Sequence, residues 1–531
     1  MPGSAPAGER YRILWVTPEV EGLAGTGPAA RGSFWLPRTL AALGHQVRVV
    51  LPRCRATPRG RTLGDFPVVL GGRRLTAIVR ALRPTVRDRR GRRRALPVFL
   101  LDNYEFFDRE EPAGYPDDGE RFSFFCRAVA DLVQRARWQV DVLHLHDWPT
   151  GPLALLARQL PGACDRRLAC ACVFTFYLAQ RQGRFGRETL ALLGLPDSLF
   201  HPDALELYGQ VSFLKAGLLY ADALATVSRA YARQIQEAPH GHGLEGLFRV
   251  LAGRLTGVVH GIDAESCDPA RDRSLYRPFS ADQLGSRTHN KVALLQDLGL
   301  SADGIVAAPS VPLAAYVGEL THRRGARLLL DALPGLMERR VRVVVLGCGE
   351  PDLERSFQQA AQTYPGQLGV VLGFNPVRIR RTYAGADMVL VPALEKPEIT
   401  GHLMAMRYGA VPVVRAQGSL ADTVLDFETG TGMGNGFVFR GTAPEDFLHA
   451  VDRALDVFRH PQHWQNLVRN CMGFDGSWLR TAVEYTGLYA QAMAQARARP
   501  QPGLESPHGH PAGPPAAVGP STRLYRDGGR H

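Results

Sequence analysis

Two histidines, an aspartate and a tryptophan stand together in the segment HLHDW, where His144 and His146 are followed by Asp147 and Trp148. Imidazole and carboxylate groups can transfer protons or bind a metal ion, so this segment is a first candidate for chemistry. The apolar residues before it predict a strand, on which His144 and His146 would share one face. A metal site needs at least a third protein ligand, and the sequence offers none beside them. We therefore expect no metal here and interpret both histidines as hydrogen-bonded core residues.

A run of basic residues is the second candidate. Residues 80–94 hold eight arginines and one aspartate, a net charge of +7, and such a run could bind a polyanion. It contains no aromatic residue on which a base could stack, and DRRG between two apolar stretches is typical of an exposed hairpin tip. A solvated basic hairpin is therefore the first interpretation and a polyanion contact the alternative, and nucleic acid is not an expected partner.

The composition bounds the class of protein. The chain has 531 residues, 45% of them hydrophobic and 21% charged, with a formal net charge of +12. These values are typical of a globular protein of two or three domains and exclude a disulfide mini-protein or a disordered chain. No apolar stretch approaches the roughly 20 residues of a membrane helix and residues 1–12 do not resemble an export signal, so we expect a cytoplasmic protein with no membrane partner. The cysteines include no C-x-x-C pair, which predicts reduced thiols at Cys54, Cys126, Cys164, Cys170, Cys172, Cys267, Cys348 and Cys471.

Two series of alternating strand and helix patterns must position these residues. The first begins with the strand YRILWV at Tyr11, followed by a glycine-rich loop, a helix and a second β-branched strand. The second begins with LAAYV after residue 312. Such alternation predicts an α/β fold of two Rossmann-like domains facing each other across a cleft, with ligands bound at the carboxyl ends of the strands. We expect a disordered start at 1–10, an N-terminal domain at 11–265 with the basic hairpin at 80–94, a linker region at 266–305, a C-terminal domain at 306–476, a crossover helix at 477–499 and a disordered tail at 500–531.

Several longer segments carry a family resemblance. DNYEFFDRE is similar to D-N-x-x-x-F-D-R, HLHDWPTG to H-A-H-D-W-H-T-G, and HGIDAESCDPARD to N-G-I-D-x-x-x-x-D-P-x-x-D. FLKAGLLYADALATVS, AMRYGAVPVVR and GSLADTV match three further motifs of the same family. Over about residues 11–490 the chain thus resembles bacterial glycogen synthases and plant starch synthases. The resemblance implies the GT-B type glycosyltransferase fold and retaining transfer of glucose from ADP-glucose to α-1,4-glucan, with no cofactor. It also places His146, Asp147 and Trp148 on the acceptor side.

Positions that carry catalysis in this family are altered here. The family loop K-T-G-G-L-A-D corresponds to GTGPAAR, so Gly25 replaces the lysine beside the nucleotide sugar, whereas Gly27 keeps a glycine. T-I-H-N corresponds to TFYL, which places Tyr177 at the histidine that contacts glucose. S-R-L-T-x-Q-K-G corresponds to GELTHRRG, so Glu319 stands at the diphosphate-binding arginine and Arg324 at the lysine.

A further departure lies in F-E-P-C-G-L-T, which aligns through its proline with EKPEITG. Lys396 then replaces the catalytic glutamate, Glu398 the cysteine and Ile399 the glycine, whereas a shift by one residue would offer Glu395 as the acid. Because Glu398 precedes an expected helix, its carboxylate could meet the backbone N–H groups that otherwise hold phosphate.

Two features of the nucleotide pocket resemble the family pattern. Gly347 belongs to the strand-to-helix turn LGCGE, and Phe374 stands where the family has an aromatic residue over the adenine. Packing is the alternative role for Phe374, and turning the chain is the alternative for Gly347.

The reversed charges at Glu319 and Lys396 decide the expected activity. A unit charge about 4 Å away is worth roughly 4 kcal/mol at an effective dielectric constant near 20, and each 1.36 kcal/mol changes a rate about tenfold. We therefore expect an ion pair between Glu319 and Lys396 and little or no glucosyl transfer from ADP-glucose.

Three functions follow as hypotheses. The first is a catalytically impaired pseudoenzyme of glycogen metabolism that binds α-glucan or a partner glycogen synthase, for which a nucleotide sugar is a doubtful ligand. The second is an active glycosyltransferase with a changed donor or acceptor, in which Glu395 or Glu398 acts together with Arg324. The third is a polyanion-binding protein that acts through the hairpin at 80–94.

Overall fold

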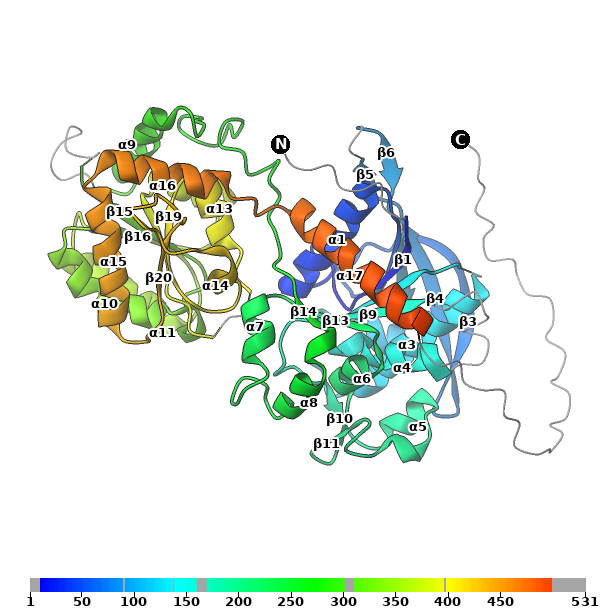
Figure 1. Ribbon diagram of the computed structural model, residues 1–531. Coiled ribbons are helices and arrows are strands. Elements are labelled where there is room, and N and C mark those ends of the chain that lie inside the picture. Colours follow the sequence, from blue (N-terminus) through cyan, green and yellow to red (C-terminus); the bar gives the residue numbers. More distant parts are fainter. Residues whose placement is uncertain are drawn as a thin grey trace, which may run out of the picture. The chain divides into compact units, whose positions relative to one another are not determined.

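The structure is a computed structural model that describes residues 10–88, 91–136, 138–159, 170–300, 310–395 and 398–498. The chain divides into two compact units (Figure 1). Unit 1 contains the residues up to Thr226, the segment Ile235–Thr256 and the residues from Ala482 onward. Unit 2 contains Val227–Gln234 and Gly257–Thr481.

A nine-stranded sheet forms the centre of unit 1, in the order β14-β13-β9-β8-β1-β2-β7-β4-β3. The first strand, β1, pairs in parallel with both β2 and β8, whereas β4 pairs antiparallel with β7 and β3. The strand order therefore reverses beside β1, and in such sheets ligands bind at the carboxyl ends of the two strands that flank the reversal. The strands are β1 (Arg12–Val16), β2 (Gln46–Pro52), β3 (Arg61–Leu70), β4 (Arg73–Leu82), β7 (Val98–Asp102), β8 (Val142–His146), β9 (Ala171–Phe176), β13 (Ala223–Thr226) and β14 (Leu255–Gly257).

Helices cover this sheet. The first helix starts at Pro28, whose missing N–H costs nothing at a helix start, and ends before Gly44, whose φ of 107° suits glycine. Helix α4 packs against both α3 and α6. A small sheet of β10 (Arg184–Phe185), β12 (Gln210–Ser212) and β11 (Glu206–Leu207) lies outside the main sheet. The helices are α1 (Pro28–Leu43), α2 (Tyr104–Phe107), α3 (Asp118–Arg135), α4 (Gly151–Gln159), α5 (Thr189–Leu193), α6 (Phe213–Tyr220) and α8 (Glu245–Val250).

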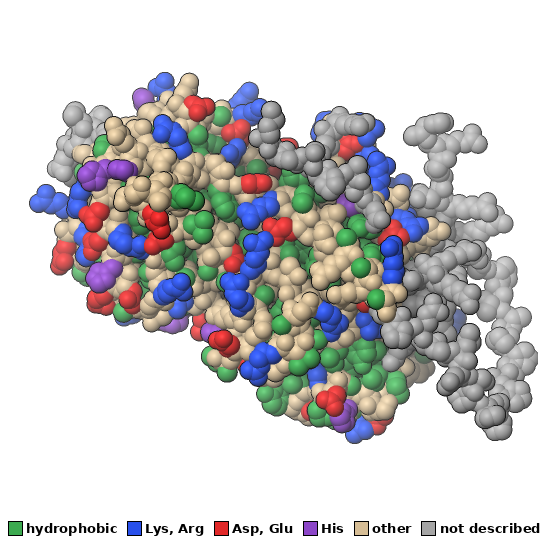
Figure 2. Space-filling view, viewed as in Figure 1, with side chains coloured by type: hydrophobic (Ala, Val, Ile, Leu, Met, Phe, Trp, Pro, Cys, Tyr) green, Lys and Arg blue, Asp and Glu red, His purple; other side chains and the backbone are tan. Residues whose placement is uncertain are grey.

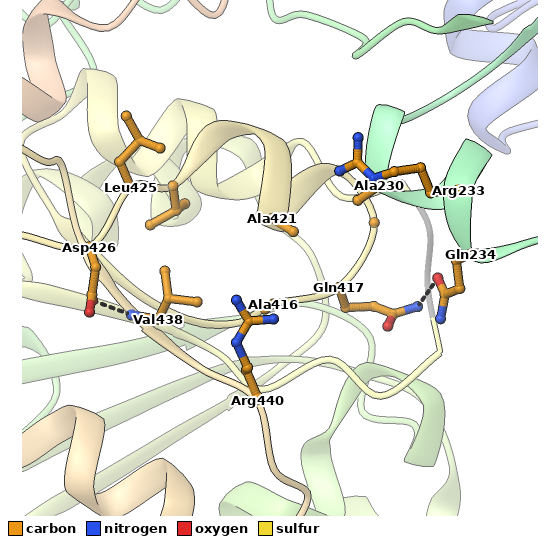
Figure 3. A pocket seen from close by; sticks show the side chains of 12 residues that line it. Ala230, Arg233, Gln234, Ala416, Gln417, Ala421, Leu425, Asp426, Val438 and Arg440 are labelled. Carbon is orange, nitrogen blue, oxygen red and sulfur yellow. Dashed lines mark hydrogen bonds between the residues drawn. The ribbon is translucent and has the colours of Figure 1, made fainter.

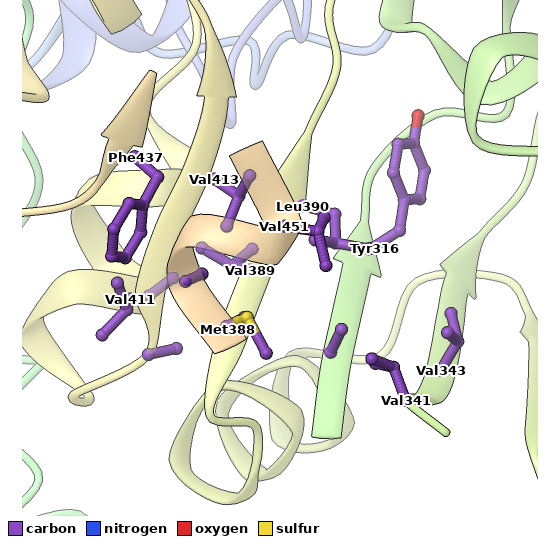
Figure 4. Close-up of a cluster of buried hydrophobic side chains, with 14 of the residues drawn as sticks. Tyr316, Val341, Val343, Met388, Val389, Leu390, Val411, Val413, Phe437 and Val451 are labelled. Atoms are coloured by element: carbon purple, nitrogen blue, oxygen red, sulfur yellow. The ribbon is translucent and has the colours of Figure 1, made fainter. Parts of the chain in front are cut away.

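The six strands of the unit 2 sheet are all parallel, in the order β17-β16-β15-β18-β19-β20. Numbered along the chain this order is 3-2-1-4-5-6, the Rossmann order, with its reversal between β15 and β18. The strands are apolar along their length because helices cover both faces, and Figure 4 shows valines of these strands packed beside Val451 of α15. The strands are β15 (Leu313–Val317), β16 (Arg342–Gly347), β17 (Leu368–Leu372), β18 (Met388–Val391), β19 (Val411–Arg415) and β20 (Phe437–Phe439). The helices are α7 (Arg229–Gln234), α9 (Arg287–Asp297), α10 (Ala326–Glu338), α11 (Pro351–Thr363), α12 (Pro376–Gly385), α13 (Gly401–Arg407), α14 (Ser419–Thr423), α15 (Pro444–Phe458) and α16 (Pro461–Gly473).

The boundaries differ from the expected ones in two places. The second segment of unit 1 ends at Thr256 instead of 265, and the region 266–305, expected to be a linker, belongs to unit 2 over its described part. Leu275 and Phe279 lie in the core of unit 2, and Lys291 of α9 forms a 2.7 Å ion pair with Asp387. These side chains are spaced irregularly along the sequence, so no periodicity predicted that they are buried.

The last helix, α17 (Trp478–Ala498), corresponds to the expected crossover helix at 477–499. Its residues from Ala482 onward belong to unit 1. There the Tyr489 hydroxyl lies 2.8 Å from His144 Nδ1, and the Tyr485 hydroxyl lies 3.3 Å from Thr175 Oγ1. The expected disordered ends, 1–10 and 500–531, lie outside the described residues except for Arg10.

The basic run forms a hairpin of β5 (Thr85–Arg87) and β6 (Arg93–Ala95). Its buried Asp88 pairs with Arg92 and Arg94, which offsets part of the charge. Arg80 lies instead on β4 and pairs at 2.7 Å with the buried Asp102, so it is not part of the hairpin tip. Basic side chains gather over β5 and β6 in Figure 2, and the polyanion contact stays a prediction.

Three further observations on the described residues concern membrane helices, metal sites and cysteines. None of their helices is both long and apolar enough to cross a membrane. No three of their His, Cys, Asp or Glu side chains are grouped so that they could hold a metal ion. Their cysteines are all free thiols, and Cys164 lies outside the described part.

Candidate functional site

The reversal of the unit 1 sheet brings together two acidic side chains. Glu19 lies in the loop that follows β1, and Asp147 follows β8 directly. Glu19 was not singled out from the sequence, although its place between a strand and a glycine-rich loop was a signal for it. The negative charge of Asp147 acts on the Glu19 carboxyl.

Burial raises the pKa of both acids. The pKa of Glu19 rises to about 7 because its carboxyl is desolvated and because Asp147 is close, with Arg181 acting in the opposite direction. The pKa of Asp147 rises to about 6, again because of burial. Asp147 also has a φ of 60°, which is uncommon for a residue other than glycine and is found preferentially at functional sites. Its Oδ1 accepts a 2.9 Å hydrogen bond from the Trp148 amide.

The glycines of the first loop make room for Glu19. Gly25 has a φ of 78°, and a Cβ at this position would lie 2.0 Å from Glu19 Oε2. A Cβ at Gly27 would lie 3.7 Å from Glu19 Oε1, which is an ordinary contact. The family's lysine therefore cannot simply be placed at position 25 unless Glu19 moves.

His146, another of the expected acceptor-side residues, ends β8 directly before Asp147. The Tyr177 hydroxyl lies 3.3 Å from His146 Nδ1, and the His146 ring stacks on Trp15 with 3.9 Å between centroids. His144 is the core residue expected from the sequence, because its ring nitrogens contact Tyr489 and Thr175 at 2.8 Å each.

Trp148 packs in an aromatic group with Phe122, Phe185 and Phe213. The region where the strand order of unit 1 reverses therefore combines carboxyl, imidazole and phenol groups with a packed group of aromatic rings, of which Phe122 and Phe213 are buried. Groups of these kinds suit the hydroxyls and the apolar faces of a sugar.

Replacing Glu19 with glutamine is expected to stabilise the protein at neutral and higher pH. The folded state holds the Glu19 proton more tightly than the unfolded state, so stability present below pH 4.5 is lost as the pH rises through about 7. Glutamine does not titrate, and the difference is on the order of 3 kcal/mol. The gain in melting temperature over the wild type should therefore grow between these pH values and then level off. A gain in melting temperature that does not change with pH would contradict this expectation. An equal gain from the exposed control Glu237→Gln would contradict it as well.

The reversal of the unit 2 sheet holds Glu319 and Arg324. Glu319 follows β15, its side chain is 49% exposed, and its Oε2 lies 3.5 Å from Arg324 Nε. The loop after β18 packs against the same turn, because the amides of Leu394 and Glu395 both donate to the Arg323 carbonyl. Gly325 is needed at this contact, since a Cβ there would lie 1.9 Å from the Pro392 carbonyl oxygen.

The expected Glu319 to Lys396 ion pair stays a prediction, because Lys396 lies outside the described residues. The described partner of Glu319 is Arg324. Glu395, the alternative acid, lies on the surface with its Oε2 3.8 Å from Arg323 Nε. The turn therefore carries two ion pairs near the surface, Glu319 with Arg324 and Glu395 with Arg323.

Glu398 has a partner that sequence reasoning missed. Its Oε1 lies 3.2 Å from His260 Nδ1, and both side chains are almost fully buried. The His260 ring also contacts Trp478, with 5.0 Å between ring centroids. The signal was present, because His260 replaces the asparagine of the N-G-I-D motif just as Glu398 replaces the cysteine of the other motif. Two departures from the family pattern are thus neighbours in space.

The remaining nucleotide-pocket residues have different surroundings. Ile399 is buried in a small apolar cluster with Val414 and Leu420, so it is a core residue. Phe374 is 50% exposed, which does not fit the alternative that it serves packing. At Gly347 a Cβ would lie 1.8 Å from the Gly318 carbonyl oxygen, so close chain contact alone requires this glycine.

Two Rossmann-like units whose candidate residues gather at the reversal of each sheet define the class, which is a glycosyltransferase of the GT-B type. Two family models match the chain: the starch synthase catalytic domain over residues 12–250 and the glycosyl transferases group 1 domain over residues 305–470. The chain belongs to the glycogen synthase and starch synthase family.

Individual relatives agree with this assignment. The glycogen synthase of Moorella thermoacetica is 39% identical over 488 residues, which cover 92% of this chain and 98% of that protein. The glycogen synthase of Desulforudis audaxviator is 38% identical over 489 residues, covering 91% of this chain and 96% of that protein. The catalytic domain of starch synthase IV from Arabidopsis thaliana, solved with ADP and acarbose, has a TM-score of 0.79 and 26% identity, covering 92% of this chain and all of that one.

Proposed function

We propose that this protein binds α-glucan in glycogen metabolism and transfers little or no glucose from ADP-glucose. The observation that carries this proposal is the pairing of Glu319 with Arg324 at the carboxyl end of β15. By the family resemblance, two cations at these positions would face the diphosphate of the donor. Here one position is acidic and its carboxylate lies beside the remaining cation, so the pair offers a diphosphate little net positive charge.

The buried neighbourhood of Glu398 supports the same proposal. A nucleotide-sugar site needs room and unoccupied hydrogen-bond donors for the phosphates. Glu398 instead places a buried carboxylate beside His260, and Ile399 belongs to the core. Both features reduce what the site can offer an anionic donor.

Residues of unit 1 support the proposal that the protein binds glucan. Hydrogen-bonding groups lie where the strand order of unit 1 reverses, and they belong to Tyr177, His146, Asp147 and Glu19. The Arabidopsis relative was solved with acarbose, which is a reason to expect that this family fold accommodates a sugar chain. A protein that keeps the glucan side and loses the donor side could act on glycogen through a partner glycogen synthase.

Titration calorimetry with maltoheptaose and with ADP-glucose tests the proposal, together with incorporation of labelled glucose into glycogen. We expect heat from maltoheptaose, none from ADP-glucose, and no incorporation above a protein-free blank. Asp147→Asn should weaken maltoheptaose binding. Incorporation at an ordinary turnover number, or the absence of maltoheptaose binding, would overturn the proposal.

An active glycosyltransferase is the second candidate. Its support is the 39% identity to a glycogen synthase over 92% of this chain. In that case Glu395 or Glu398 would take part in catalysis together with Arg324. A thermal-shift screen of nucleotide sugars separates the candidates, because a true donor stabilises the fold by mass action.

A further inference from the structure

A pocket of about 520 Å³ lies in unit 2, away from the β15 to β18 reversal (Figure 3). It is formed where β19 and β20 end, between the loop after β19, the segment after α14 and helix α7. None of the residues discussed above as donor or acceptor positions lines it. Its polar lining residues are Arg233, Gln234, Gln417, Asp426 and Arg440.

Two arginines give this pocket its charge. Arg233 comes from α7 and Arg440 from the end of β20, and in Figure 3 their side chains enter the pocket region from different sides. Both are exposed, and among the described residues no carboxylate pairs with either guanidinium. The one acid of the lining, Asp426, already pairs with Arg453 and accepts a 2.8 Å hydrogen bond from the Val438 amide. The pocket therefore carries two positive charges without a described counter-charge.

The rest of the wall suits a small polar molecule. Gln417 is almost buried, and its Nε2 donates to Gln234 Oε1 at 3.4 Å, so the pair of amides has further donors and acceptors for hydroxyl groups. Ala421, Val424 and Val438 supply a short apolar wall. The volume lies within the range of pockets for small metabolites.

The pocket is already assembled without a ligand. The Asp422 carboxylate accepts hydrogen bonds from the Ser228 hydroxyl at 2.7 Å and from the amides of Arg229 and Ala230 at 2.6 and 3.1 Å. These bonds hold the start of α7 against α14, although the two segments lie almost 200 residues apart in the sequence. A ligand would therefore find both arginine-bearing walls in place.

We propose that this pocket binds a phosphate monoester of a small polyhydroxyl compound, with Arg233 and Arg440 holding the phosphate and the two glutamines contacting the hydroxyls. Arginine presents a planar set of N–H donors that matches a phosphate group. A carboxylate offers fewer oxygens and less charge at neutral pH than a phosphate monoester, so the phosphate is the better match for two guanidinium groups. The site is independent of glucosyl transfer and of glucan binding in unit 1.

Titration calorimetry on the full chain tests this proposal with ribose 5-phosphate, inorganic phosphate and succinate as probes. We expect ribose 5-phosphate to bind most tightly, inorganic phosphate more weakly and succinate weakest. Arg233→Gln and Arg440→Gln should each weaken ribose 5-phosphate at least tenfold, and increasing salt should weaken it in the wild type.

Arg469→Gln is the matched control, because Arg469 is exposed on α16 and does not line the pocket. It should bind ribose 5-phosphate like the wild type, and circular dichroism should show all three variants folded. No detectable binding of ribose 5-phosphate to the wild type would overturn the proposal. The proposal would also be overturned if both pocket variants bound ribose 5-phosphate as tightly as the wild type, or if Arg469→Gln lost as much affinity as they do. Tighter binding of succinate than of ribose 5-phosphate would overturn it as well.

Discussion

Replacing Glu319 with arginine is expected to tighten ADP binding by about tenfold to a hundredfold. The substitution turns a repulsive charge beside a diphosphate into an attractive one and removes the ion pair with Arg324. At 4 Å a unit charge is worth about 1 kcal/mol in water and about 4 kcal/mol at an effective dielectric constant of 20. Because the Glu319 side chain is half exposed, the lower end applies, and reversing the charge gives about 2 kcal/mol, or roughly thirtyfold.

Calorimetric titration of ADP measures this effect. Glu319→Gln should fall between the wild type and Glu319→Arg, since it removes the repulsion without adding an attraction. Glu338→Arg makes the same charge change at the far end of α10 and should leave ADP affinity nearly unchanged. Equal affinity in all three variants would show that the charge at position 319 does not govern donor binding.

Separating Glu398 from His260 is expected to cost about 3 kcal/mol of folding stability. Each of the variants His260→Asn and Glu398→Cys introduces the residue of the family motif, and each leaves the other member of a buried pair without this partner. Leaving a buried polar group without its partner typically costs about 1–3 kcal/mol, and more where the group is charged. The double variant should lose less than the sum of the single losses, with a coupling energy of about 1–3 kcal/mol.

Urea denaturation monitored by circular dichroism gives the four stabilities of this cycle. His449→Asn, an exposed histidine on α15, is the control and should change stability by less than about 0.5 kcal/mol. Strictly additive losses would contradict the expectation that the two replacements compensate each other.

The fold could be predicted because its signals are local. The alternation of apolar strands and helices predicts two Rossmann-like domains, and each unit has a central sheet with parallel strands, although β4 of unit 1 pairs antiparallel with β3 and β7. The region 266–305 could not be assigned in this way, because Leu275 and Phe279 enter the core from irregular chain. These side chains are buried by residues that are far away in the sequence, so the apolar positions show neither a helix nor a strand periodicity.

The site could be located from motifs, but its contacts could not. Glu319 stands at the expected edge, and only the structure shows that Arg324 lies beside it, whereas the expected pair with Lys396 stays a prediction. His260 and Glu398 lie 138 positions apart, and only the fold shows that the two replacements meet. Glu19 was missed because its role depends on the space that Gly25 leaves open.

The route of the chain has a consequence for biosynthesis. Unit 1 is made of three separate segments, and its last segment starts at Ala482, near the end of the sequence. The partners of His144 and Thr175 are Tyr489 and Tyr485, which the ribosome adds more than 300 residues later. The first unit therefore cannot complete its core before α17 has been synthesised, and a chain truncated before α17 would leave these buried polar groups exposed to chaperones and proteases.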